Sequence, residues 1–212
     1  MNYKDKIMYK AALRGIDFCV HFTNVTNLPS ILQYGILPKK TMDEERIEYN
    51  ENDSLRLDGY PCATSLSFTS PNYRMFYKYR TENPQKRWVV LVIDSKEVIS
   101  LDCAYCYTNA ANSSITGISL DKLMTVQAFD AMFEEIDNQE SRQRMRLSDN
   151  EPTDPQAEIL VFDVIPPEAI KYIFFDNYCT MQQYISLLDK MHILCSCDRG
   201  VFSPRRDYSF WQ

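Results

Sequence analysis

Residues 154–175 read DPQAEILVFDVIPPEAIKYIFF and carry the strongest fold signal in the chain. Two runs rich in β-forming residues, 158–165 and 171–175, flank a Pro-Pro pair that cannot continue a β-ladder. We therefore expect two successive strands here. Glu158 opens the first strand, where a buried charge is costly unless it is partnered or functional. An ion pair on the surface rim is the alternative explanation for this glutamate.

A second unusual segment lies far upstream, HFTNVTNLPSILQYGIL (21–37). FCVHF (18–22) predicts a short strand, and His21 and Thr23 face the same side of it because side chains alternate along a strand. TNLPSILQYG (26–35) predicts a short helix, with Thr or Asn as its cap, proline in its first turn and glycine after its end. An imidazole beside a hydroxyl can bind a ribose or an adenine edge. A buried histidine satisfied by the backbone is the plainer alternative.

The rest of the chain mixes strands and short helices without strict alternation, which predicts an α+β fold. Residues 39–58 are polar and acidic, as in a surface loop. The other expected elements are an extended segment that becomes helical over 60–80, strands over 88–94, 98–102 and 192–197, and helices over 119–137 and 180–191.

Composition indicates an ordinary globular protein of 212 residues, with 45% hydrophobic and 25% charged residues. No apolar run approaches the roughly 20 residues that span a bilayer, so no membrane association is expected. Seven cysteines without the density of a secreted scaffold favour a reducing cytoplasm. The net charge of −6 argues against a nucleic-acid partner. Locally the balance reverses, with six Lys/Arg against two Asp/Glu over 1–40 and five against one over 72–87.

Common cofactor motifs are missing from the sequence. It contains neither GxGxxG after a strand nor GxxxxGK[ST], which argues against a Rossmann site and a P-loop. A CxxC pair (Cys103, Cys106) and a CxC pair (Cys195, Cys197) lie about 90 residues apart, a poor spacing for a structural zinc site. We expect these cysteines in the core and no bound metal.

Arginine and aromatic residues provide the candidates for nucleic-acid contact. The stretch 73–88 could stack on bases and bind phosphates of a single strand, and Arg74 and Tyr77 are its candidates. Core aromatics with a solvated basic face are the alternative. Arg146 closes a cluster of three arginines upstream of Glu158. Arg56, in the polar loop, could hold a pyrophosphate or could be an ordinary surface arginine.

Together these segments resemble the DarT family of ADP-ribosyltransferase toxins. The His-x-Thr pair with its Asn-Leu-Pro-x-Ile-Leu helix looks like the family's opening block, and the Ala-Glu-x-Leu-Val strand looks like the closing block with the catalytic glutamate. SPNYRMFY (70–77) and CYTNAANSSI (106–115) follow the family's order between them. The resemblance covers about 18–175 of one domain, 1–212, and leaves a C-terminal helix, strand and tail over 176–212.

The resemblance implies a fold and a set of functional residues. The fold would be an ADP-ribosyltransferase-like split, mostly antiparallel β core with short helices around a cleft, and the co-substrate would be NAD. Glu158 and Arg56 would be catalytic, with Arg56 orienting NAD or the target base, since a guanidinium cannot accept a proton; Arg46 competes for that role. NAD would be bound by His21, Thr23, Asn27, Gly35 and Leu37, and the nucleic acid by Arg74, Tyr77 and Arg146.

The activity that the resemblance implies is that of a toxin which transfers ADP-ribose from NAD to a nucleic-acid base, first in single-stranded DNA. RNA bases, a protein substrate and a catalytically inactive binding module are the alternatives. A cognate antitoxin is the expected partner, together with a chaperone that could read the tail VFSPRRDYSFWQ (201–212); a last packed strand is the other reading of this tail. The segment 57–70 departs from the DNA-modifying members, and Asn109 stands where the family tends to have an acid.

Overall fold

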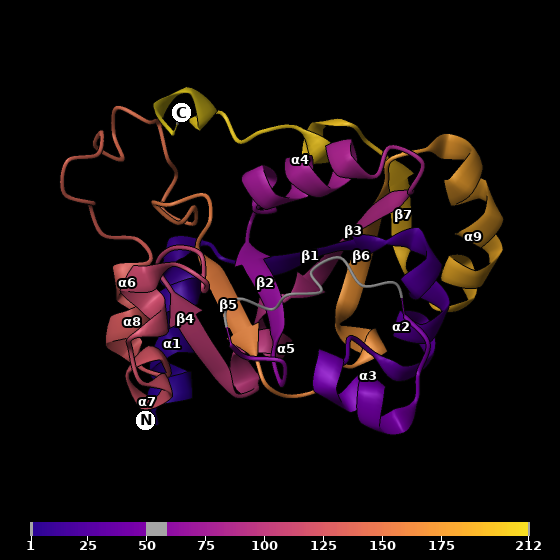
Figure 1. Ribbon diagram of the computed structural model, residues 1–212, viewed down its shortest axis with the longest axis horizontal. Coiled ribbons are helices and arrows are strands. Elements are labelled where there is room, and N and C mark those ends of the chain that lie inside the picture. The colour runs from indigo at the N-terminus through magenta and orange to yellow at the C-terminus, as the bar shows by residue number, and fades with distance from the viewer. Residues whose placement is uncertain (1, 50–58, 212) are drawn as a thin grey trace.

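A seven-stranded β-sheet forms the centre of the computed structural model, which describes residues 2–49 and 59–211 (Figure 1). Its strand order is β4-β5-β2-β1-β3-β6-β7, and all neighbours run antiparallel except β6 and β7. The strands are β1 (Phe18–Asn24), β2 (Thr64–Phe68), β3 (Trp88–Asp94), β4 (Cys103–Cys106), β5 (Glu158–Val161), β6 (Ile170–Phe175) and β7 (Leu194–Cys197). This topology confirms the mostly antiparallel α+β prediction.

The sheet is split between β1 and β2. All seven residues of β1 pair with β3, but only Cys19 and Val20 pair with β2, opposite Phe68 and Ser67. Beyond Val20 the two central strands diverge. One half-sheet therefore holds β4, β5 and β2, and the other holds β1, β3, β6 and β7.

Both faces of the central strands are buried, which explains why WVVLVID lacks a polar alternation. Leu91 and Ile93 of β3 join Cys19 in the main core on one face. Trp88 and Val90 point to the other face, in a second cluster with Val20, Phe76 and Phe202. Alternate residues of one strand thus contribute to two separate cores.

Nine helices in the described residues cover the sheet and its open edges. In Figure 1, α4 lies across the top of the sheet, α2 and α3 sit below β1, and α9 flanks β7. The helices are α1 (Tyr3–Arg14), α2 (Leu28–Tyr34), α3 (Lys39–Glu45), α4 (Tyr73–Glu82), α5 (Ser95–Ser100), α6 (Ser113–Thr116), α7 (Leu120–Leu123), α8 (Val126–Ala131) and α9 (Tyr178–Lys190), with 3-10 turns η1 (Val25–Asn27), η2 (Pro167–Ala169), η3 (Gly200–Phe202) and η4 (Tyr208–Phe210).

Three local predictions were wrong. The polar stretch after Pro38 begins with α3, because its Lys, Met and Glu residues are good helix formers. The strand expected over 98–102 is instead the end of α5, which the side chain of Asp94 caps by accepting from the Lys96 amide at 2.9 Å. The strand β5 ends at Val161, four residues early.

Other differences concern helix ends and the tail. Asn27 occupies the N-cap position of α2, as predicted, but without a side-chain cap hydrogen bond, whereas the side chain of Asn24 caps η1. The tail forms η3 and η4 rather than a strand, and its Arg205 and Asp207 are buried, which does not favour a free docking or chaperone-binding segment. No helix of the described chain is long and apolar enough to cross a bilayer.

The cysteine pairs lie far apart. Cys103 and Cys106 are buried on β4, and Cys195 and Cys197 lie on β7. These two strands are the opposite ends of the sheet, so the pairs do not meet.

Candidate active site

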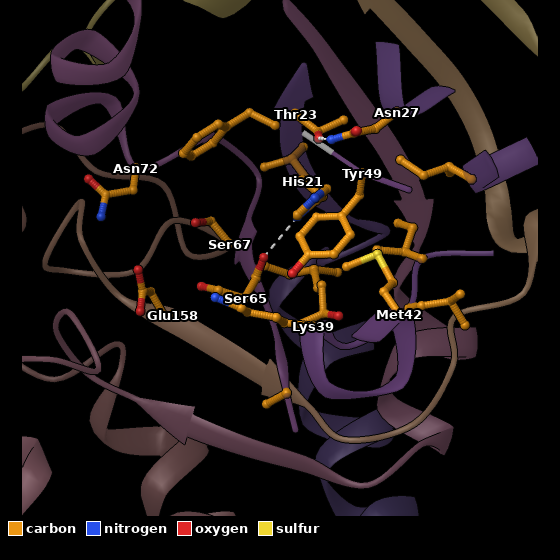
Figure 2. A pocket seen from close by; sticks show the side chains of 18 of the residues that line it. His21, Thr23, Asn27, Lys39, Met42, Tyr49, Ser65, Ser67, Asn72 and Glu158 are labelled. Atoms are coloured by element: carbon orange, nitrogen blue, oxygen red, sulfur yellow. Dashed lines mark hydrogen bonds between the residues drawn. The ribbon is translucent and has the colours of Figure 1, made fainter. Parts of the chain in front are cut away.

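The split between β1 and β2 opens into a pocket that holds most of the candidate residues (Figure 2). Residues from β1 and β2 line its two sides because these strands diverge after Val20. The helices α2 and α3 and the start of α4 contribute further walls. The polar lining residues are His21, Thr23, Asn27, Ser30, Lys39, Tyr49, Thr64, Ser65, Ser67, Asn72, Tyr79, Asn109 and Glu158.

The β1 side of the pocket is built around His21 and Thr23. Both line the pocket, as the strand alternation predicts. Thr23 is buried, and its hydroxyl accepts a hydrogen bond from the Asn27 side chain at 2.9 Å. The Nδ1 atom of His21 lies 3.0 Å from the carbonyl oxygen of Ser65. Because a carbonyl only accepts, Nδ1 carries the hydrogen, and the ring is fixed across the split.

Gly35 shapes the pocket through its backbone. Its φ of 87° lies in the left-handed region, and a Cβ there would meet the carbonyl oxygen of Ile165 at 2.3 Å. Ile36 pairs with Ile165 in an isolated antiparallel bridge, which requires this close approach. Gly35 and the neighbouring Leu37 both line the pocket. A glycine is therefore needed here by packing, whatever it contacts in a ligand.

Glu158 lies inside the pocket, on the β5 side, and not on a surface rim. It is 4% exposed and begins β5, next to β4 and β2. Its Oε1 accepts from the Asn109 side chain and its Oε2 from the Ala110 amide, each at 3.1 Å. These two donors compensate for burial of the charge. The carboxylate is thus held in one orientation.

The contacts of Asn109 account for an asparagine at a position where an acid was expected. Its amide nitrogen donates to Glu158, which the side chain of an ionised acid could not do. The Asn109 oxygen in turn accepts from the Ala111 amide at 2.9 Å. Asparagine therefore bridges the loop after β4 to the glutamate.

Several pocket residues were not anticipated. Lys39 and Met42 come from α3, and Tyr49 follows it; all three were expected in a loop. Ser65 and Ser67 alternate with apolar residues on β2, a period-two signal that could have revealed them. Figure 2 shows Tyr49 and Met42 on the side of the pocket away from Glu158.

Asn72 was also missed, because a single asparagine beside a proline reads only as a helix cap. It does cap α4, accepting from the Met75 amide at 3.2 Å. Its buried Nδ2, like the buried Oγ1 of Thr64, has no hydrogen-bond partner among the described residues. Both residues line the pocket, so its wall offers polar groups to a polar ligand.

The remaining candidates lie elsewhere. Arg56 falls outside the described residues. Arg46 is exposed at the end of α3, with a φ of 56°, and does not line the pocket. Arg74 and Tyr77 are exposed on α4. Arg146 is exposed, with a φ of 58°. The structure does not bring these last three residues into the pocket.

Comparison with known proteins places this pocket in context. Residues 20–197 match the family model described as "DarT: ssDNA thymidine ADP-ribosyltransferase, DarT". None of the curated proteins matches the sequence.

Solved structures share the fold at low sequence identity. Thermosipho africanus DarTG in complex with ADP-ribose is 16% identical with a TM-score of 0.61, over 88% of this chain and 51% of that one. This chain therefore spans about half of the DarTG chain. Thermus sp. 2.9 DarT in complex with carba-NAD+ is 13% identical (TM-score 0.58, 89% and 98% covered), and with ADP-ribosylated ssDNA it is 15% identical (0.54, 89% and 97%).

Proposed function

The chain belongs to the DarT family of ssDNA thymidine ADP-ribosyltransferases, and on that basis we propose that it transfers ADP-ribose from NAD to thymidine in single-stranded DNA. The observation that carries this proposal is a buried carboxylate, Glu158, in the same pocket as the polar side chains of His21, Thr23 and Asn27. The pocket sits where the two half-sheets separate. The Thermus DarT structures, described as complexes with carba-NAD+, NAD+ and ADP-ribosylated ssDNA, have this fold.

The pocket suits a dinucleotide. Two buried polar atoms in its wall, Thr64 Oγ1 and Asn72 Nδ2, lack partners among the described residues and match the hydroxyl and amide groups of NAD. We assign His21, Thr23 and Asn27 to one end of NAD, with Gly35 and Leu37 against the same part of it. Apolar lining from β2 and α2 supplies the walls that such a ligand buries.

The chemistry requires a fixed negative charge. NAD supplies an activated nicotinamide–ribose bond, and positive charge develops on the ribose as this bond breaks. Glu158 would accept a hydrogen bond from a ribose hydroxyl and stabilise that charge, more strongly in the transition state than in the ground state. Its two N–H donors hold it in place for this role. Nicotinamide leaves, the N3 atom of thymine bonds to the anomeric carbon in its place, and the N3 proton is released to solvent.

The remaining candidate residues are assigned to binding of NAD and of the DNA strand. We assign Arg56 to binding and orienting NAD or the base. Arg74, Tyr77 and Arg146 are exposed outside the pocket, so we assign them to the strand that flanks the modified base. A cognate antitoxin is the expected partner, in line with the DarTG description of the Thermosipho structure.

Labelled NAD tests the activity directly. The protein is incubated with NAD labelled in the adenine and with separate pools of single-stranded DNA, RNA and protein. Label is expected on thymidine-containing DNA and not on an oligonucleotide that lacks thymidine. Label on RNA alone would replace the substrate, and label on none of the pools would leave a binding module as the function.

A further inference from the structure

The C-terminal segment after β7 makes hydrogen bonds to the loop that leads into Glu158. Residues 198–211 follow the end of the family match at 197. In Figure 1 the C-terminus lies beside the long connection between α8 and β5, which leads into Glu158. We call 198–211 the C-terminal strap and 138–157 the approach loop.

The centre of the strap is a buried ion pair. The Arg205 guanidinium donates from Nε and Nη2 to the two carboxylate oxygens of Asp207, each at 2.7 Å. The side chains are only 4% and 0% exposed. Trp211 Nε1 also donates to Asp207, at 2.8 Å. Burying such a pair is costly unless further hydrogen bonds satisfy the remaining donors of the guanidinium.

The remaining donors of Arg205 hold the approach loop. Arg205 donates to the backbone carbonyl of Pro152 at 2.7 Å and to that of Thr153 at 2.9 Å. One guanidinium therefore binds Asp207 and two carbonyls of the loop together, which its planar fork of donors permits. The loop is also held by Gln139, which donates to the Phe210 carbonyl at 2.9 Å.

A short chain of contacts leads from this clamp to Glu158. Asp154 follows the two clamped residues directly. Its side-chain carboxylate accepts from the Gln156 backbone amide at 2.7 Å, and its backbone carbonyl accepts from the Ala157 amide at 3.1 Å. These bonds form the turn that delivers the chain into β5 at Glu158. Burial raises the pKa of Asp154 from its ordinary value, and a hydrogen bond from Thr108 opposes that rise.

The strap is also anchored on helix α4. The Phe202 ring packs against that of Phe76 of α4 in a tilted arrangement, with ring centroids 5.5 Å apart. Arg80 of α4 lies over the Phe76 ring and donates to the Phe202 carbonyl. Since α4 begins at Asn72 in the pocket wall, the strap ties that wall to the approach loop.

We propose that Arg205 is a positioning residue for Glu158, acting through the Pro152 and Thr153 carbonyls, and that the C-terminal strap thereby sets the geometry of the active site. This inference rests on the proposed function of Glu158. Arg205 touches neither NAD nor the base.

Two variants separate positioning from folding. Arg205→Lys keeps the charge but lacks the fork that reaches Asp207 and both carbonyls. The double variant Arg205→Met/Asp207→Leu replaces the buried pair with apolar groups and leaves no unpaired buried charge behind. Arg206→Ala is the matched control, because this neighbour is exposed and contacts the same loop only at Ser148 and Glu151.

Amide hydrogen exchange by NMR gives the deciding measurement, since it needs no turnover. The Ala110 amide donates to Glu158, so its exchange rate reports whether the carboxylate stays in place. We expect faster exchange at Ala110 and Ala157 in both Arg205 variants, and no change in the Arg206 control. Unchanged exchange at Ala110 would overturn the proposal even if the protein proved inactive on every substrate.

Kinetics provide the second readout. A displaced Glu158 should lower kcat by about 10–100-fold and leave KM for NAD within about twofold, because Arg205 donates to Asp207, Pro152 and Thr153, which are not among the NAD-binding residues assigned above. A fall in kcat that only matches the loss of folded protein would show a merely structural role. Failure of the wild type to modify any pool would overturn the proposed function, while the exchange rates would still decide the role of Arg205.

Discussion

At the scale of single residues, Glu158 is the most sensitive position in the pocket. A glutamine there keeps the shape but turns one oxygen into a donor, which then faces either Asn109 or the Ala110 amide. We expect Glu158→Gln to lower the rate of ADP-ribosyl transfer by about 10²–10³, measured with labelled NAD and a thymidine-containing oligonucleotide. The control is Glu168→Gln, an exposed glutamate on η2. Equal activity of the two variants would refute the catalytic assignment.

The second prediction for a single residue concerns the effect of Gly35→Ala on stability. Alanine there would adopt an unfavourable positive φ and push against the Ile165 carbonyl. We expect Gly35→Ala to lower the free energy of unfolding by more than about 2 kcal/mol, measured by denaturant unfolding. Gly117→Ala is the control, because Gly117 has negative φ and open space around it, and it should be close to neutral. Equal effects would show that the bridge to Ile165 is not rigid.

At the scale of elements, the N-cap of helix α9 allows its contribution to the free energy of unfolding to be measured. The Asn177 side chain accepts from the Thr180 amide at 3.0 Å and so satisfies one free donor at the helix start. We expect Asn177→Ala to lower the free energy of unfolding by about 1 kcal/mol. Gln183→Ala, on an exposed position of the same helix, should change it by less than about 0.5 kcal/mol. The comparison is made by thermal or urea unfolding, and the reverse ranking would contradict the cap.

Local signals explain which elements could be predicted from the sequence. The strands around WVVLVID and KYIFF were confirmed because each is an uninterrupted run rich in β-forming residues. The helix α5 was missed because its residues Val98 and Ile99 favour strands, while its start depends on one cap at Asp94. The helix α1 was not foreseen, although Asn2 and Asp5 form a capping box there.

The site was predictable only where a motif lies on a regular element. His21, Thr23 and Glu158 stand on strands, so alternation and strand ends locate them. Tyr49 and Asn72 reach the pocket through tertiary packing of α3 and α4, which leaves no periodic trace in the sequence. The contact of Arg205 with Pro152 joins residues more than 50 positions apart, and no local pattern could indicate it.

At the scale of the whole molecule, the split sheet raises the question of whether its halves fold together. Only Cys19 and Val20 of β1 pair with β2, so few backbone bonds join the halves. The main hydrophobic core nevertheless runs across the split, and it includes Cys19 of one half and Cys103 of the other. Side-chain packing, more than the short β-ladder, therefore connects the two halves, which predicts one cooperative unfolding unit.

The two buried thiols allow this prediction to be measured. Burial raises the pKa of Cys103 to about 12 and that of Cys19 well above its ordinary value, so at pH 8 both stay protonated and unreactive until the fold opens. We expect Cys19 and Cys103 to be alkylated at the same rate, with the same urea dependence, as read by peptide mass spectrometry. The exposed Cys62 and Cys179 serve as internal controls that react in the native state. Faster labelling of Cys103 than of Cys19 at low urea would show that the β4-β5-β2 half opens alone, and the pocket between the halves would then open with it.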